Sequence, residues 1–150
     1  MWTLDGHAQL LPQVPPWFFH DVRDVDGDQL PDLLTHGPFR SQLPSNCGVR
    51  DCPSELKGPE LLAHNLGKGF SFTDAASAAH LKQSCKQLSG SALEQMATQG
   101  VCRRLQGDTV DAILEDVDKQ RTKLCKNAKQ CPALDIMSDW IRAPLPKLLR

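Results

Sequence analysis

The spacing of apolar residues changes near residue 74. Before that point, short apolar runs alternate with polar residues and are bounded by Gly, Pro, Asn and Asp, a pattern typical of strands. The pattern predicts strands at 17–22, 33–35, 60–65 and 70–73. A further hairpin is expected at 2–11, around the turn dipeptide Asp5-Gly6. The four prolines of residues 37–59 indicate a loop.

After residue 74 the apolar residues recur every three or four positions, which predicts helices. Ser91 and Glu94 have the spacing of a capping box that begins a helix ending near Arg104. Asp108 is expected to cap a longer helix, and Pro132 to begin the last one. The apolar faces of the expected helices carry Ala78, Leu81, Cys85, Leu88, Val110, Ile113, Leu114, Val117, Leu124, Leu134, Met137, Trp140 and Ile141.

These two patterns predict an α+β fold, in which a small antiparallel sheet is covered by a C-terminal helical cap. The 150 residues fit one domain, and 40% of them are hydrophobic, enough for a sizeable core. We expect residues 1–74 to form a β region and residues 75–150 to form a helical region that packs on it. The alternative is that the sheet is completed only by further parts of a longer protein.

The charges of the chain nearly cancel, with a net charge of −1, although residues 1–75 are acidic and residues 76–150 are basic. This balance argues against a general nucleic-acid or membrane-surface binder. Five basic residues in 119–129 are interpreted as a solvated helix face, because no aromatic residues alternate with them. No apolar run approaches the ~18 residues of a membrane span, and residues 1–12 lack the pattern of a signal peptide.

Six cysteines favour an oxidising compartment, and hence a secreted, periplasmic or cell-surface protein. The pairs Cys47–Cys52 and Cys125–Cys131 are each expected to close a local loop, with free thiols or a metal as alternatives. Cys85 and Cys102 lie on predicted helices and pair either with each other or with the later cysteines. The missing signal peptide is reconciled with export if this chain is a piece of a longer protein.

The most informative segment is the acidic stretch Asp24-Val25-Asp26-Gly27-Asp28-Gln29-Leu30-Pro31-Asp32. Carboxylates crowded in one loop repel one another unless a cation lies between them. Ca²⁺ accepts 6–8 oxygen ligands with flexible geometry. The alternative is an acidic surface turn without a metal, because Asp and Gly are common in turns. The side chains expected to bind calcium are Asp24, Asp26, Asp28 and Asp32, joined by the backbone carbonyl of Leu30.

An EF-hand does not explain this loop. An EF-hand has Gly at the sixth position and a bidentate Glu at the twelfth, where this sequence has Gln29 and Thr35. The flanking segments are also predicted strands rather than helices.

The stretch DVDGDQLPDL (24–33) resembles the calcium loop of FG-GAP, or VCBS, repeats, which form the blades of integrin-like β-propellers. Residues 61–81, LLAHNLGKGFSFTDAASAAHL, are similar to the strand, glycine turn and final strand of such repeats. The resemblance implies Asp24, Asp26, Asp28, Leu30 and Asp32 as calcium ligands on a blade of four strands. It covers roughly residues 17–81. Gln29 stands where the family usually has Gly, and the cysteine-containing insert 37–58 interrupts the blade.

Three functions are therefore compared. The first is a non-catalytic, exported calcium-binding module whose ion fixes a surface for a protein or glycan partner. The second is an accessory segment of a secreted hydrolase or toxin, and the third is a helical protein-interaction domain at 90–150. We expect no enzyme, because nucleophile and phosphate-loop motifs are missing and the histidines are scattered along the chain.

Overall fold

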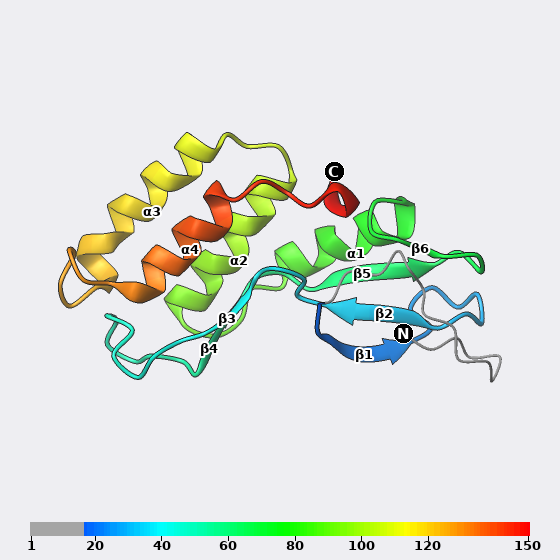
Figure 1. The fold of residues 1–150 in the computed structure, drawn as a ribbon, viewed down its shortest axis with the longest axis horizontal. Helices are drawn as coiled ribbons and strands as arrows, with labels where there is room; N and C mark the ends of the chain where they lie inside the picture. Colours follow the sequence, from blue (N-terminus) through cyan, green and yellow to red (C-terminus); the bar gives the residue numbers. More distant parts are fainter. Residues whose placement is uncertain (1–16) are drawn as a thin grey trace.

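The computed structural model describes residues 17–150, so the hairpin predicted at 2–11 lies outside the described residues. The described part is α+β, as predicted from the sequence (Figure 1). Its strands are β1 (Phe19–Arg23), β2 (Asp32–Thr35), β3 (Arg40–Gln42), β4 (Glu55–Lys57), β5 (Leu61–Asn65) and β6 (Phe70–Ser71). Its helices are α1 (Ala75–Lys86), α2 (Ala92–Leu105), α3 (Val110–Leu124), α4 (Pro132–Arg142) and the short 3₁₀ turn η1 (Lys147–Leu149).

The main sheet has four antiparallel strands in the order β1-β2-β5-β6. All four residues of β2 are buried, because this strand has neighbours on both sides and the sheet is covered by helix α1 along β5 (Figure 1). Leu33 pairs with Ala63 and Leu34 with Leu62. Strand β1 lies at the edge and is largely exposed. The predicted strands of the main sheet are thus confirmed, with small shifts of their ends.

The segment 37–59 was expected to be a loop, and this prediction is wrong. It holds the antiparallel hairpin β3–β4, in which Ser41 pairs with Leu56. The prolines that indicated a loop flank these two short strands rather than interrupt them. The fully buried side chain of Leu56 and an Arg40–Glu55 ion pair of 2.8 Å hold the hairpin together.

The helices begin close to their predicted signals. Helix α1 is capped by Asp74, and α2 has the capping box in which Ser91 and Glu94 each accept a bond from the other's backbone amide. Helix α4 starts at Pro132. The predicted cap of α3 is wrong by one residue: Thr109 caps this helix, because Asp108 instead accepts a hydrogen bond from Arg103 at 2.7 Å.

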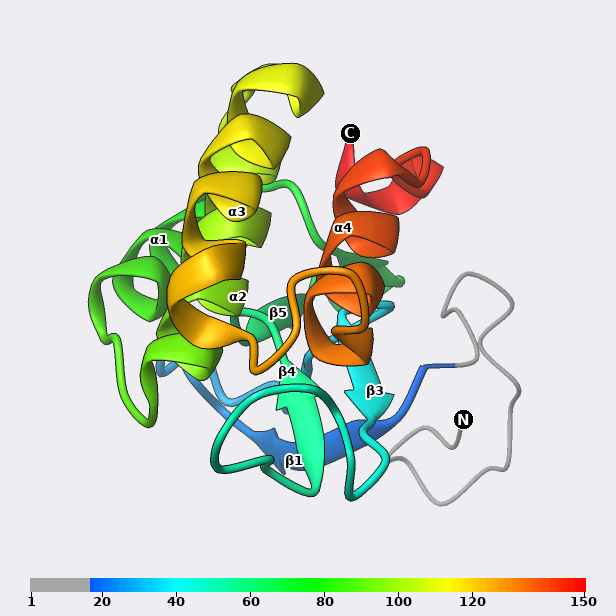
Figure 2. The same ribbon diagram turned by 90° about the vertical axis from the view of Figure 1, so that its left-hand side faces the viewer.

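The inserted hairpin packs with the helices into one hydrophobic core. Figure 2 shows helices α2, α3 and α4 at one end of the molecule, with the β3–β4 hairpin beside them. The hairpin supplies Leu56 and the residues next to it supply Phe39 and Val49. The buried helical side chains of this core are Leu93, Ala97, Val101, Ile113, Val117, Ala133, Leu134, Met137, Trp140 and Ile141. Within residues 17–150, no helix is both long and apolar enough to cross a membrane.

Three disulfides cross-link the segment from residue 47 to residue 131, and their pairing settles what the sequence left open. The expected local pairs Cys47–Cys52 and Cys125–Cys131 are both formed. Cys85 pairs with Cys102 and joins α1 to α2. Three such bonds indicate an oxidising environment, since disulfides are rare where thiols are kept reduced.

Candidate metal site

The acidic loop predicted to bind calcium connects β1 to β2. It lies next to the turn between β5 and β6, where the side chain of Leu30 approaches Gly67. Both connections therefore gather at the same end of the main sheet (Figure 1). This placement brings side chains from β5 within reach of the loop.

Backbone amides hold the aspartates of the loop in place. One carboxylate oxygen of Asp24 accepts a hydrogen bond from the amide of Gly27 at 2.7 Å, and the other accepts one from Gln29 at 2.9 Å. The bond from Gln29 is the largest cause that lowers the pKa of Asp24. Asp26 and Asp28 each use Oδ1 to accept an amide bond, from Asp28 and Leu30 respectively. The Oδ2 atoms of Asp26 and Asp28 accept none of these amide bonds and are therefore available to other partners.

Asp32 differs from the other aspartates because its side chain is fully buried at the start of β2. Its Oδ2 accepts the amide of Val25, and its Oδ1 accepts the amide of Asn65 at the end of β5, both at 2.9 Å. One carboxylate thus ties the beginning of the loop to the neighbouring strand. A buried carboxylate is costly unless it is hydrogen-bonded, and these two amides supply that compensation.

The predicted aspartates come together as the sequence indicated. Asp24, Asp26 and Asp32 each offer a ligand atom within 4.8 Å of the others, and Asp26 and Asp28 form a second group with His64. All four predicted carboxylates therefore belong to one of two groups that could hold a metal ion. The carbonyl of Leu30 remains a prediction as a ligand.

The backbone at Gln29 explains how the loop closes without the glycine usual in the resembled family. Gln29 has a φ of 71°, in the left-handed region that favours Gly. It is the one non-glycine residue with a positive φ in residues 17–150. The loop therefore adopts a glycine-like turn here, and the amide bond from Gln29 to Asp24 accompanies it.

His64 is the residue of this site that sequence reasoning missed. Its Nε2 lies 2.7 Å from Oδ2 of Asp26 and 3.7 Å from Oδ2 of Asp28. Its Nδ1 bonds to the carboxylate of Asp74, the cap of α1, and this bond is the main cause that raises the pKa of His64. The pairing of Leu33 with Ala63 places His64 opposite Asp32, and nothing in the sequence alone indicates this register.

A second cluster of histidines surrounds Glu60, just before β5. His20 donates to one oxygen of this carboxylate at 2.8 Å and His80 to the other at 2.9 Å. These bonds, that of His80 first, lower the pKa of Glu60 to about 2. The ring of His36 stacks on that of His20, and burial lowers the pKa of His36. Histidines that are scattered in the sequence are therefore gathered around one carboxylate.

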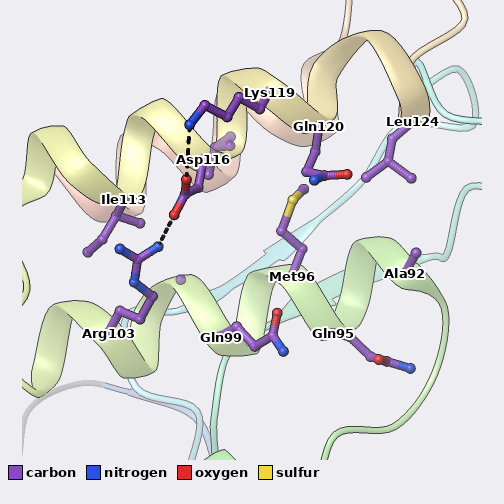
Figure 3. Close-up of a pocket in the computed structure, with 12 residues that line it drawn as sticks. Ala92, Gln95, Met96, Gln99, Arg103, Ile113, Asp116, Lys119, Gln120 and Leu124 are labelled. Atoms are coloured by element: carbon purple, nitrogen blue, oxygen red, sulfur yellow. Dashed lines mark hydrogen bonds and ion pairs between the residues drawn. The ribbon is translucent and has the colours of Figure 1, made fainter.

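The helical end of the molecule carries a shallow groove of about 420 Å³ between α2 and α3 (Figure 3). Met96 and Ile113 supply apolar surface there. Asp116 of α3 pairs with Arg103 of α2 and with Lys119 of its own helix. The charged groups of this groove are thus paired with one another.

Comparison of the chain with protein-family models, with curated proteins and with solved structures found no match.

Proposed function

We propose that the Asp24–Asp32 loop binds Ca²⁺ and that the protein is a non-catalytic calcium-binding module related to the FG-GAP, or VCBS, repeats. The observation that carries this proposal is the convergence of four carboxylates from one nine-residue loop into two overlapping groups. Such a set of oxygen donors suits a hard dication, and a cation between the carboxylates removes their mutual repulsion.

The proposed ion would act on the fold through the chain's own residues. Asp24, Asp26, Asp28 and Asp32 would hold it, joined by the carbonyl of Leu30. Because Asp32 also bonds to Asn65 of β5, an ion bound by Asp32 would fix the loop against both β2 and β5. This would stiffen one end of the sheet, as a surface prepared for a protein or glycan partner.

The three disulfides support an exported location for this module, secreted or at the cell surface, where millimolar calcium is compatible with a weak site. Calcium would then be a structural ion that the protein keeps bound outside the cell.

The test is a calcium titration by calorimetry together with thermal unfolding. With calcium at 100 times Kd, the free energy of unfolding should rise by about 2.7 kcal/mol, which corresponds to roughly 5–10 °C in a chain of this size. The double variant D26N/D28N should lose both the binding heat and the shift. The charge-matched double variant D51N/D139N changes two exposed aspartates elsewhere and should keep them. Equal melting temperatures of the wild-type protein in calcium and in EDTA would refute the proposal.

A further inference from the structure

The imidazole of His64 presents a polar atom that its surroundings do not satisfy. The side chain is only 13% exposed, and its Nε2 is buried without a hydrogen-bond partner in the described part of the chain. The carboxylate of Asp26 lies within ion-pair distance of Nε2, but the geometry is not that of a hydrogen bond. Buried polar side-chain atoms are nearly always bonded, so this one requires an explanation.

The orientation of the His64 ring is fixed from its other side. Nδ1 donates to Oδ2 of Asp74, while Oδ1 of Asp74 accepts the amide of Ser77 at 3.0 Å in the cap of α1. Both oxygens of Asp74 are therefore engaged, and the ring is aimed with Nε2 toward the loop. A histidine that binds a metal through one nitrogen commonly donates its other N–H to a carboxylate in this way.

Two free carboxylate oxygens face Nε2. Oδ1 of Asp26 and Oδ1 of Asp28 are occupied by backbone amides, so their Oδ2 atoms are the ones available. These lie 2.7 and 3.7 Å from Nε2. Ligand atoms at bond lengths of ~2.0–2.1 Å around a tetrahedral ion are roughly 3.3 Å apart, which falls between these two distances.

We propose that His64, Asp26 and Asp28 form a position for a first-row transition-metal dication such as Zn²⁺, with Asp74 as the outer carboxylate that orients the histidine. One nitrogen and two carboxylate oxygens suit such an ion better than calcium, which prefers oxygen ligands alone. Asp26 is shared with the oxygen-only group of Asp24 and Asp32. This inference rests on the proposed function in that both require the loop to bind a cation.

The test measures Zn²⁺ and Ca²⁺ binding separately, on the full chain, by calorimetry. H64Q should weaken Zn²⁺ binding at least tenfold and change Ca²⁺ binding less than threefold, whereas D24N should weaken Ca²⁺ binding more than Zn²⁺ binding. D74N should weaken Zn²⁺ binding about tenfold, as is usual for the loss of an outer-shell carboxylate. H80Q is the matched control, because the side chain of His80 is similarly buried, at 16% exposed, and is also bonded to a carboxylate, and it should leave Zn²⁺ binding unchanged.

Imidazole ¹⁵N spectra of the wild-type protein supply a readout that does not depend on how the variants fold. Zn²⁺ should shift the ¹⁵N signal of Nε2 of His64 selectively, while the imidazole signals of His20, His36 and His80 remain unchanged. Zn²⁺ affinity that is equal in H64Q and wild type, or shifts confined to the Glu60 cluster, would show that His64 only forms an ion pair with Asp26. If the protein binds Zn²⁺ through His64 but does not bind Ca²⁺, the proposed function is wrong and this inference is supported.

Discussion

Gln29 closes the acidic loop through a backbone conformation that is unusual for a residue with a side chain. Its positive φ places a residue with a Cβ in backbone space that glycine occupies freely. The following amide bonds in the loop, from Gln29 to Asp24 and from Leu30 to Asp28, depend on that turn. The loop therefore has a strained residue next to the amides that bind the carboxylates of Asp24 and Asp28.

The variant Q29G should relieve this strain. We expect it to raise the free energy of unfolding by about 0.5 kcal/mol, because the removed left-handed penalty of ~1 kcal/mol exceeds the entropy added to the unfolded chain. G27A is the opposite change, since Gly27 has a φ of 81° and open space around its missing Cβ. It should destabilise the protein by roughly 1 kcal/mol in urea unfolding. A more stable G27A, or a less stable Q29G, would show that these turns are not what limits the loop.

Glu60 should make the free energy of unfolding fall at acidic pH. Its pKa falls from an ordinary 4.5 to about 2 through its bonds to His80 and His20. Because the folded state favours the charged carboxylate, the contribution is complete above pH 4.5 and disappears as the pH falls through 2. E60Q should cost about 1–2 kcal/mol at pH 6 and less than half of that at pH 3, measured by urea unfolding. The exposed control E115Q should cost little at either pH, and an E60Q loss that is independent of pH would contradict the argument.

The carboxylates of the candidate site could be predicted from the sequence, whereas its histidine could not. The aspartates are close in the chain, so their crowding follows from spacing alone. His64 reaches them only through the pairing of β2 with β5, and Asp74 reaches His64 only because it caps a helix packed on that strand. Both steps need the register of the sheet, which single-sequence patterns leave open.

At the level of elements, the helices could be predicted from local sequence, whereas the β3–β4 hairpin depends on contacts that are distant in the chain. Local signals such as the capping box of Ser91 and Glu94 mark where helices begin, and the structure confirms this one. The hairpin strands are three residues each, too short to show an alternating pattern. What stabilises them is distant in the chain: Trp140 of α4 donates to Ser41 of β3, and Val49 pairs with Cys125 beyond α3.

The Cys47–Cys52 loop and the Cys125–Cys131 loop approach each other closely at Gly48. A Cβ on Gly48 would lie 2.7 Å from the Cα of Cys131, and Gly48 has a φ of +93°. G48A should therefore destabilise the protein by roughly 3 kcal/mol, combining backbone strain with overpacking. G107A is the matched control, since Gly107 has a φ of +99° but open space, and it should cost only about 1 kcal/mol by thermal unfolding. Equal losses in the two variants would show that backbone strain alone, without overpacking between the loops, sets the cost.

For the whole molecule, the Cys85–Cys102 disulfide closes the largest of the three covalent rings, with a sequence separation of 17. Closing a loop of this size is expected to contribute about 3 kcal/mol, mainly by restricting the unfolded chain. The double variant C85A/C102A should lose about that much in urea unfolding. C47A/C52A, which opens a ring with a separation of 5, should lose about 2 kcal/mol. A loss below 1 kcal/mol for C85A/C102A would show that this disulfide contributes little to the stability of the fold and that other contacts hold α1 against α2.

All six cysteines fall between residues 47 and 131, so every covalent ring leaves the β1–β2 end of the sheet outside. The outermost strand there, β1, is largely exposed and no disulfide crosses it, which makes it the natural place for a protease to enter. Trypsin should cut first after the exposed Arg23 in EDTA and much more slowly in calcium, with R23Q removing the early fragment. In a medium rich in proteases, the bound ion would decide how long the chain survives.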